Sequence, residues 1–149
     1  NARYLFGRTE WDHWSQEQNS QARGEDIIGD SVQPIVDANL ADLVDSDHKI
    51  TDEIWLEPTP GHTPGHVSVR ISSQGEDALI TGDFMHHPCQ MARPNWRSSA
   101  DYDGEWAENT RNGLLEQYAD QPVLVIGTHF ATPTAGHILR DGDVYRFKV

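Results

Sequence analysis

The chain has 149 residues, the length of one ordinary domain, with 24 acidic against 11 basic residues and a formal net charge of −13. This balance argues against a nucleic-acid partner or an anionic membrane, because phosphate groups bind basic surfaces. The single cysteine, Cys89, excludes an internal disulfide and a Cys-x-x-Cys metal site, and it is compatible with the cytoplasm. No apolar stretch is long enough to cross a membrane, and a hydrophobic fraction of 36% with five tryptophans predicts a folded, soluble domain.

The first third of the chain is predicted to contain one strand and two helices. Residues 3–6 have the composition of a strand, and the tryptophan-rich segment 9–14 can start a helix before a polar loop at 15–26. Apolar residues then recur at helical spacing, which predicts a helix over 31–45.

The remaining two thirds are predicted to alternate between strands and a helix. A helix is expected over 103–119, capped by Asp103 and ended before Pro122. Five strands are expected from short runs that either alternate or are continuously apolar: residues 53–56, 66–72, 78–81, 122–126 and 144–149. No internal repeat or linker separates these elements, so the sequence predicts one α/β unit.

A turn with two histidines separates the first two of these strands. Residues 59–66 read Thr-Pro-Gly-His-Thr-Pro-Gly-His, so His62 and His66 are four residues apart. On a helix this spacing would place both on one face, but the glycines and prolines prevent a helix here. We therefore expect a rigid turn to present His62, and His66 to begin the next strand. By itself the segment is equally compatible with a turn that carries two incidental histidines.

Two further candidate ligands follow buried strands. Asp83 ends a Thr-Gly-Asp segment after one apolar run, and His129 ends a Gly-Thr-His segment after another. Alone, each has an ordinary interpretation, as a surface turn or as a hydrogen-bonded histidine at a sheet edge. Together with His62 they lie at the carboxyl ends of three strands, where α/β folds bind ligands. Imidazole and carboxylate groups suit zinc or iron, whereas calcium or magnesium would need mostly oxygen ligands.

These three motifs, in this order, resemble the C-terminal half of the metallo-β-lactamase superfamily, and within it the branch of lactonases and organophosphate hydrolases. The resemblance runs from about Tyr4 to the end. It implies an α/β fold of the αββα sandwich type, with residues 1–149 forming the C-terminal part of a single domain. It also implies two zinc ions, or iron or manganese. His62 would bind one and His129 the other, Asp83 would bridge both, and His66 would support the turn.

One part of the family pattern does not occur in this sequence. The family has a His-x-His-x-Asp-His run with further metal ligands, and no His-x-His occurs among the 149 residues. By family order the run would precede Asn1, so we expect a fragment of a complete enzyme rather than a degenerate member. The chain would need the N-terminal half, or a swapped copy of itself, to complete the site and to cover one face of its sheet. Alone it is expected to be inactive.

The resemblance implies hydrolysis of an ester, a lactone or a similar acyl bond of a small molecule by a metal-bound hydroxide that Asp83 orients. His86, three residues after Asp83, has the position of a polar side chain that polarises the substrate carbonyl in the lactonase branch; packing or support of a ligand is the alternative. Two other functions stay open, a glyoxalase-II-like thioesterase and a non-catalytic metal-binding fragment. Thioester against lactone turnover and the metal stoichiometry would separate the three.

Overall fold

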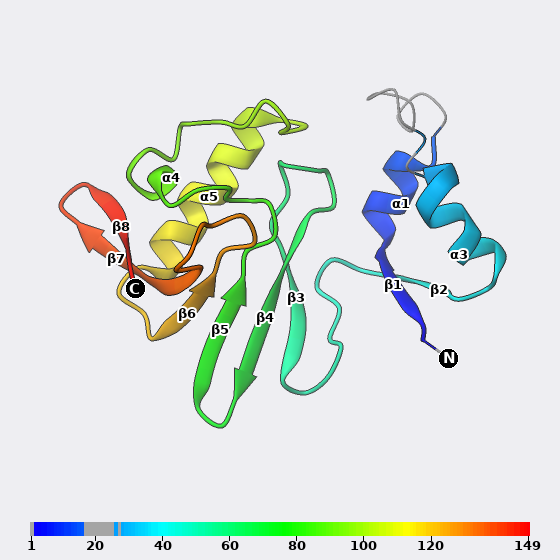
Figure 1. Cartoon of the computed structure of the whole chain (residues 1–149), viewed down its shortest axis with the longest axis horizontal. Coiled ribbons are helices and arrows are strands. Elements are labelled where there is room, and N and C mark those ends of the chain that lie inside the picture. Colours follow the sequence, from blue (N-terminus) through cyan, green and yellow to red (C-terminus); the bar gives the residue numbers. More distant parts are fainter. Residues whose placement is uncertain (1, 17–25, 27) are drawn as a thin grey trace. The chain divides into compact units, whose positions relative to one another are not determined.

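The computed structural model describes residues 2–16, 26 and 28–149 (Figure 1). The chain forms two compact units, Asn1–Ser46 and Asp47–Val149. None of the helices in the described ranges combines the length and the apolar character that a membrane crossing requires. That both units belong to a single domain stays a prediction.

The first unit contains two short strands that pair in parallel. Its elements are β1 (Tyr4–Gly7), α1 (Arg8–Trp14), the π-helical turn η1 (Ile28–Val32), α3 (Gln33–Asp37) and β2 (Ala41–Val44). The pairing runs from Tyr4 with Ala41 to Gly7 with Val44. The predicted first strand and first helix are confirmed, whereas the loop predicted over 15–26 lies mostly outside the described residues.

The helix predicted over 31–45 is wrong beyond Asp37. Asn39 has a φ of 55°, a left-handed conformation that ends the helix and that asparagine tolerates better than most residues. The following residues, 41–44, form the strand that pairs with β1. The apolar residues of this stretch fit helical spacing, but pairing with a distant segment overrides local periodicity.

The second unit is built on one six-stranded sheet with the order β3-β4-β5-β6-β7-β8. Its strands are β3 (Ile54–Pro58), β4 (Val67–Ser73), β5 (Glu76–Ile80), β6 (Val123–Ile126), β7 (Ala135–Asp141) and β8 (Val144–Lys148). Only β5 and β6 are parallel neighbours. Strands β3 and β5 are both antiparallel to β4, so β3, β5 and β6 point the same way. Their carboxyl ends therefore lie at one edge of the sheet. The candidate ligands predicted from the sequence follow these strand ends.

All five strands predicted after residue 50 are present, with ends shifted by at most two residues, but β7 was not predicted. Its start, Ala-Gly-His, lacks the β-branched and aromatic residues that favour strands. The signal that could have revealed it is the Gly142-Asp143 turn that follows, because Gly-Asp between two strand-like runs is typical of a two-residue hairpin loop. Gly142 has a φ of 61°, as such a turn requires.

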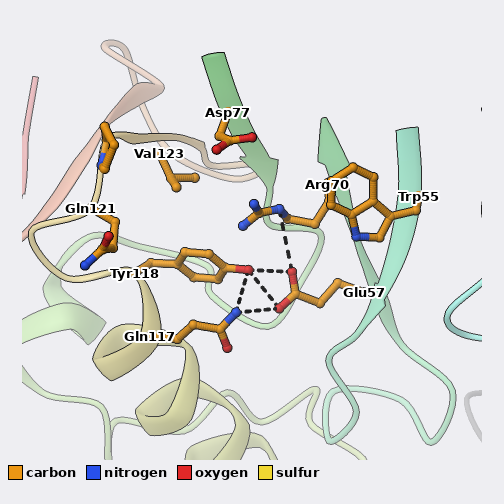
Figure 2. A pocket seen from close by; sticks show the side chains of 9 residues that line it. Trp55, Glu57, Arg70, Asp77, Gln117, Tyr118, Gln121 and Val123 are labelled. Carbon is orange, nitrogen blue, oxygen red and sulfur yellow. Dashed lines mark hydrogen bonds and ion pairs between the residues drawn. The ribbon is translucent and has the colours of Figure 1, made fainter. Parts of the chain in front are cut away.

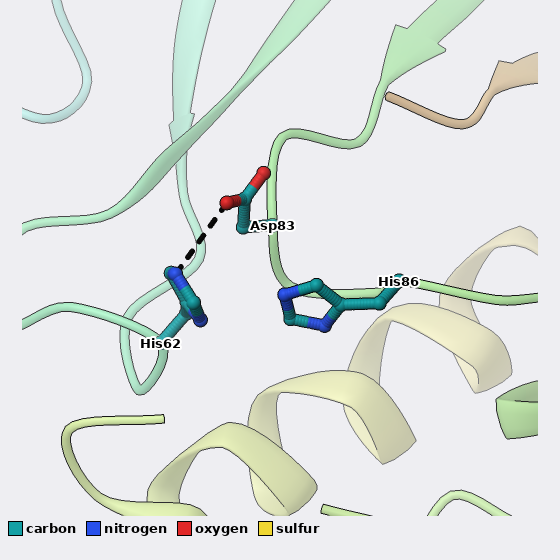
Figure 3. Close-up of side chains that lie close together, drawn as sticks. All are labelled: His62, Asp83 and His86. Carbon is teal, nitrogen blue, oxygen red and sulfur yellow. Dashed lines mark ion pairs between the residues drawn. The ribbon is translucent and has the colours of Figure 1, made fainter. Parts of the chain in front are cut away.

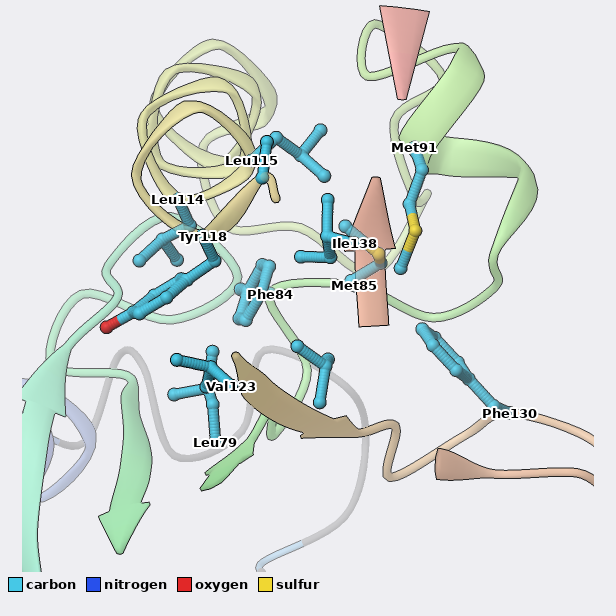
Figure 4. Close-up of a cluster of buried hydrophobic side chains, with 12 residues drawn as sticks. Leu79, Phe84, Met85, Met91, Leu114, Leu115, Tyr118, Val123, Phe130 and Ile138 are labelled. Carbon is cyan, nitrogen blue, oxygen red and sulfur yellow. The ribbon is translucent and has the colours of Figure 1, made fainter. Parts of the chain in front are cut away.

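Two helices accompany the sheet, α4 (Cys89–Ala92) and α5 (Gly104–Tyr118). Helix α5 confirms the predicted helix and its cap, since the Asp103 carboxylate accepts hydrogen bonds from the N–H groups of Glu105 and Trp106. The buried core lies between α5 and one face of the sheet (Figure 4). It contains Leu79, Phe84, Met85, Met91, Leu114, Leu115, Tyr118, Ala119, Val123, Val125, Phe130 and Ile138.

The second face of the same sheet carries a continuous row of apolar side chains, which we call the apolar second face. Directly opposed pairs cross the strands, among them Leu56 with Val69 and Val69 with Ile80. The row comprises Ile54, Leu56, Val67, Val69, Ile71, Ala78, Ile80, Leu124 and Ile126. None of these side chains belongs to the buried core, and Leu124 is 38% exposed. The sheet is therefore apolar on both faces, but its core forms on only one.

Candidate metal centre

A tight turn after β3 presents His62, as predicted. Gly61 has a φ of 128°, and a Cβ at this position would lie 2.3 Å from the backbone nitrogen of Ala107 in α5. The carbonyl groups of Gly61 and His62 each accept a hydrogen bond of 3.0 Å, from the N–H groups of Asp103 and Tyr102. Because the turn is bonded to the start of α5 and tolerates only glycine at residue 61, the position of His62 is rigid.

A second turn, after β5, presents Asp83, and His66 connects the two turns. The backbone N–H of Asp83 donates to Nε2 of His66 at 2.7 Å, so this nitrogen carries no hydrogen. The other ring nitrogen, Nδ1, lies 2.7 Å from Oγ1 of Thr59. The prediction that His66 supports the turn is confirmed, although β4 begins one residue later, at Val67.

The three predicted ligands lie together at one edge of the sheet. The two carboxylate oxygens of Asp83 face different histidines: Oδ2 lies 3.4 Å from Nε2 of His62, and Oδ1 lies 3.0 Å from Nε2 of His129. His62 is 11% exposed, Asp83 33% and His129 49%. The buried side of the cluster is therefore that of His62, and the accessible side that of His129.

His86 extends the cluster. Its ring centroid lies 5.0 Å from that of His62 and 5.3 Å from that of His129, whose ring it stacks against. His62, Asp83 and His86 each offer one atom that could bind a metal ion, and these three atoms lie within 4.8 Å of one another (Figure 3). The structure thus brings all four candidate residues together, and which of them bind metal stays a prediction.

The environment of His86 favours its neutral form. Burial lowers the pKa of the imidazole, the charge of His62 lowers it further, and Asp83 and Asp101 oppose this effect. Within the described part of the chain, the buried Nδ1 of His86 has no hydrogen-bond partner. A neutral imidazole with an unpaired buried nitrogen is suited to bind a metal or to hydrogen-bond a substrate.

Asp101 is a site residue that the sequence analysis missed. Its side chain is 1% exposed, and Oδ1 lies 3.1 Å from Nδ1 of His62, on the side of the ring away from Asp83. It comes 39 residues after His62 in an irregular segment, so no spacing or periodicity connects the two. Only the tertiary structure reveals this pair.

The chemistry of this donor set fits a zinc-type ion. Imidazole nitrogens and a carboxylate are the usual ligands of zinc, and in catalytic zinc sites they leave a position for water or substrate. At the centre of the cluster, Nε2 of His62 faces one oxygen of Asp83 at 3.4 Å, and Nε2 of His129 faces the other at 3.0 Å. A cation would satisfy them together.

A second polar cluster lies at the other end of α5 and lines a cavity of about 510 Å³ (Figure 2). The hydroxyl of Tyr118 donates to Glu57 at 2.6 and 2.8 Å, and the Gln117 amide donates to Glu57 and to the Tyr118 oxygen. The Arg70 guanidinium lies over the Tyr118 and Trp55 rings. Burial and the Glu57 carboxylate raise the pKa of Tyr118 far above its ordinary value. Glu57, Gln117 and Tyr118 thus form hydrogen bonds with one another.

Comparisons with known proteins agree with this fold. The family model of the Metallo-beta-lactamase superfamily matches residues 3–129. Similar solved structures include AidC, a dizinc quorum-quenching lactonase in complex with a product, at 22% identity and a TM-score of 0.79, covering 97% of this chain and 53% of that chain. The hydrolase AbOPH of the beta lactamase superfamily has 22% identity and a TM-score of 0.83, covering 99% and 54%. An N-acyl homoserine lactone hydrolase with its product bound at the catalytic metal centre has 20% identity and a TM-score of 0.68, covering 89% and 49%.

The likeness confirms the predicted α/β fold of the metallo-β-lactamase type. At these identities it shows the fold alone. The chain spans about half the length of the solved structures it matches. No curated protein sequence matches it.

Proposed function

The chain belongs to the metallo-β-lactamase superfamily, and from this we propose that it provides the C-terminal half of a metal-dependent hydrolase site that cleaves an ester, a lactone or a similar acyl bond. The observation that carries the proposal is the position of Asp83. Its two oxygens face two different histidines, at 3.4 and 3.0 Å. A carboxylate shared between two metal ions needs this arrangement.

In the proposed site His62 would hold one ion, His129 would hold the other and Asp83 would be shared between them, with zinc as the first candidate and iron or manganese as alternatives. When bound, such ions lower the pKa of water to about 7 and polarise the oxygen of the bond that is cleaved. Asp83 would take the proton of the attacking water on a carboxylate oxygen while the water oxygen bonds to the acyl carbon, and would give this proton to the leaving group when its bond to the acyl carbon breaks. His86 donates its single N–H to the acyl oxygen, where negative charge develops.

We further propose that a second polypeptide segment completes the site and covers the apolar second face. The matched structures are about twice as long as this chain, and the family's His-x-His-x-Asp-His run does not occur among its 149 residues. The first unit supports the same proposal, because the sheet formed by its described residues, 2–16, 26 and 28–46, has two strands, and Tyr4 and Leu5 are more than 40% exposed. The N-terminal half of the fold would do both, whereas a swapped copy of this chain, the alternative, would cover the apolar second face without supplying the run.

The test is to purify the chain together with a segment that carries this run, and to measure bound metal and hydrolysis of lactone, ester and thioester substrates. We expect two zinc ions per assembly, loss of lactone or ester turnover on chelation, and recovery on addition of zinc. A preference for thioesters would favour the thioesterase alternative. A single bound ion without any turnover would overturn the hydrolase proposal.

Paired histidine variants make this test specific to the site. His129→Ala should remove the accessible ion, whereas His137→Ala, on β7, should not. His86→Ala should lower turnover while both ions stay bound, and its exposed neighbour provides the control His87→Ala. Equal losses for His86→Ala and His87→Ala would contradict the role given to His86.

A further inference from the structure

A buried ion pair lies behind His62. The side chains of Asp101 and Arg111 are 1% and 0% exposed, and Nη2 of Arg111 lies 4.0 Å from Oδ2 of Asp101. Burial removes the hydration of both charges, and this cost can exceed the attraction between them. The pair therefore needs an explanation other than stability. Its neighbours supply one.

The two oxygens of Asp101 have different partners. Oδ1 lies 3.1 Å from Nδ1 of His62, while Oδ2 accepts the backbone N–H of Ser98 at 2.9 Å and faces Arg111. An ionised carboxylate only accepts hydrogen bonds, so Nδ1 of His62 must carry a hydrogen. In the neutral ring the lone pair is then on Nε2, which faces Asp83.

Arg111 connects the segments that carry the site. Its Nε donates to the carbonyl of Phe84, in the turn that presents Asp83, at 3.1 Å, and Nη1 donates to the carbonyl of Pro94. Through Asp101 the same guanidinium reaches the turn of His62. Arg111 thus contacts three segments that precede α5, at Phe84, Pro94 and Asp101.

We propose that Asp101 is a positioning residue that fixes the tautomer and the orientation of His62, and that Arg111 holds Asp101 in place for this task. The inference rests on the proposed function in one respect, that His62 is a metal ligand through Nε2. A partner that fixes the protonated nitrogen of a ligand histidine typically contributes 10–100-fold to metal affinity or activity.

The decisive variant is Asp101→Asn, which keeps the size of the side chain. The single oxygen of asparagine is drawn to the Ser98 N–H and to Arg111, which leaves the NH₂ group toward Nδ1 of His62. This donor forces the hydrogen of His62 onto Nε2. We expect the change directly in long-range ¹H–¹⁵N spectra of ¹⁵N-histidine-labelled protein at high pH without metal, with the His62 signals identified by their loss in His62→Gln.

Zinc titration provides the second measurement. We expect Asp101→Asn to bind zinc about 10–100-fold more weakly than the original chain. The matched control is Asp103→Ala, two residues away, which removes the cap of α5 without touching the His62 ring. It should lower the melting temperature, while the His62 tautomer and the zinc affinity stay unchanged.

The outcomes separate this inference from the proposed function. A chain that binds no zinc, but whose metal-free His62 carries its hydrogen on Nδ1 and changes tautomer in Asp101→Asn, supports the positioning role and overturns the metal site. Hydrogen on Nε2 in the unmodified protein overturns the positioning role, whether or not zinc binds. An equal loss of zinc affinity in Asp103→Ala and Asp101→Asn also overturns it, because the effect would then follow from the stability of α5.

Discussion

Helix α5 has a polar cluster near each end, and the two clusters differ in their balance of donors and acceptors. Beside its first turns, the two oxygens of Asp83 face two histidine nitrogens, one of His62 at 3.4 Å and one of His129 at 3.0 Å, and the shorter of these contacts is a hydrogen bond. At its last turn, the Glu57 carboxylate accepts hydrogen bonds from the Tyr118 hydroxyl and the Gln117 amide, and Nε of Arg70 lies 4.0 Å from it.

The difference supports our proposal that the first cluster is a functional site and that the second belongs to the fold. Imidazole nitrogens and carboxylate oxygens that converge on one point are the usual ligands of a zinc ion. A carboxylate that accepts hydrogen bonds from its neighbours needs no further partner. Substitutions at the two ends of α5 should therefore have separable effects, on activity at the first and on stability at the second.

The largest effect should come from Asp83. In the completed enzyme, Asp83→Ala should lower turnover by more than about 100-fold, since even residues that only support a metal ligand contribute 10–100-fold. Its control is Asp77→Ala, which lies at the other end of β5 and lines the second cavity. Circular dichroism should report an intact fold for both. Unchanged turnover in Asp83→Ala would contradict the assignment of the site.

The two faces of the sheet should differ in their tendency to associate, because the buried core covers one face and not the apolar second face. Contiguous apolar surfaces mark association sites, and the apolar second face is a continuous row of partly buried side chains with Leu124 38% exposed, so the 149-residue chain alone should form oligomers rather than stay a monomer. Val69→Lys, on the apolar second face, should weaken this association, whereas Gln74→Lys, in the turn after β4, should not. Light scattering on a size-exclusion column measures the mass. A uniform, well-folded monomer of 16.8 kDa would refute the prediction.

Tyr118→Phe should act on stability alone. It removes the hydroxyl that donates to both oxygens of Glu57, and hydrogen bonds to a charged group contribute about 1.5–3 kcal/mol. The free energy of unfolding in urea should fall by about this amount, while the zinc affinity stays unchanged. Tyr145→Phe is the control, with a change below about 0.5 kcal/mol. A drop in zinc affinity for Tyr118→Phe would mean that the two ends of α5 are coupled.

The smallest effect concerns alkaline pH. Because the folded state raises the pKa of Tyr118, the folded protein keeps this proton after the unfolded chain has lost it. The resulting stabilisation is complete below the unfolded pKa of about 10 and declines as the pH rises toward the folded value. Urea unfolding at several pH values should therefore give a steeper decline above about pH 10 for the original chain than for Tyr118→Phe. Parallel curves would refute the role of this tyrosine.

Much of the site could be predicted from the sequence because its signals are local. Glycines and prolines define the turn of His62, and an apolar run followed by Gly-Asp or Gly-Thr-His marks the end of a strand. Asp83 and His129 meet because β5 and β6 are parallel neighbours, and His62 joins them because β3 points the same way. The strand ends and the strand directions thus suffice to predict that these three candidate ligands meet at one edge of the sheet.

Tertiary structure alone decided the rest. Residues 41–44 have apolar spacing that fits a helix, yet they form β2, because backbone pairing with β1 is a long-range interaction. Asp101 and Arg111 look like ordinary polar residues of a loop and a helix, and only packing buries them behind His62. Periodicity reports which face of an element is apolar. It carries no information about which distant polar group meets another, because hydrogen bonds across 39 residues leave no pattern in the sequence.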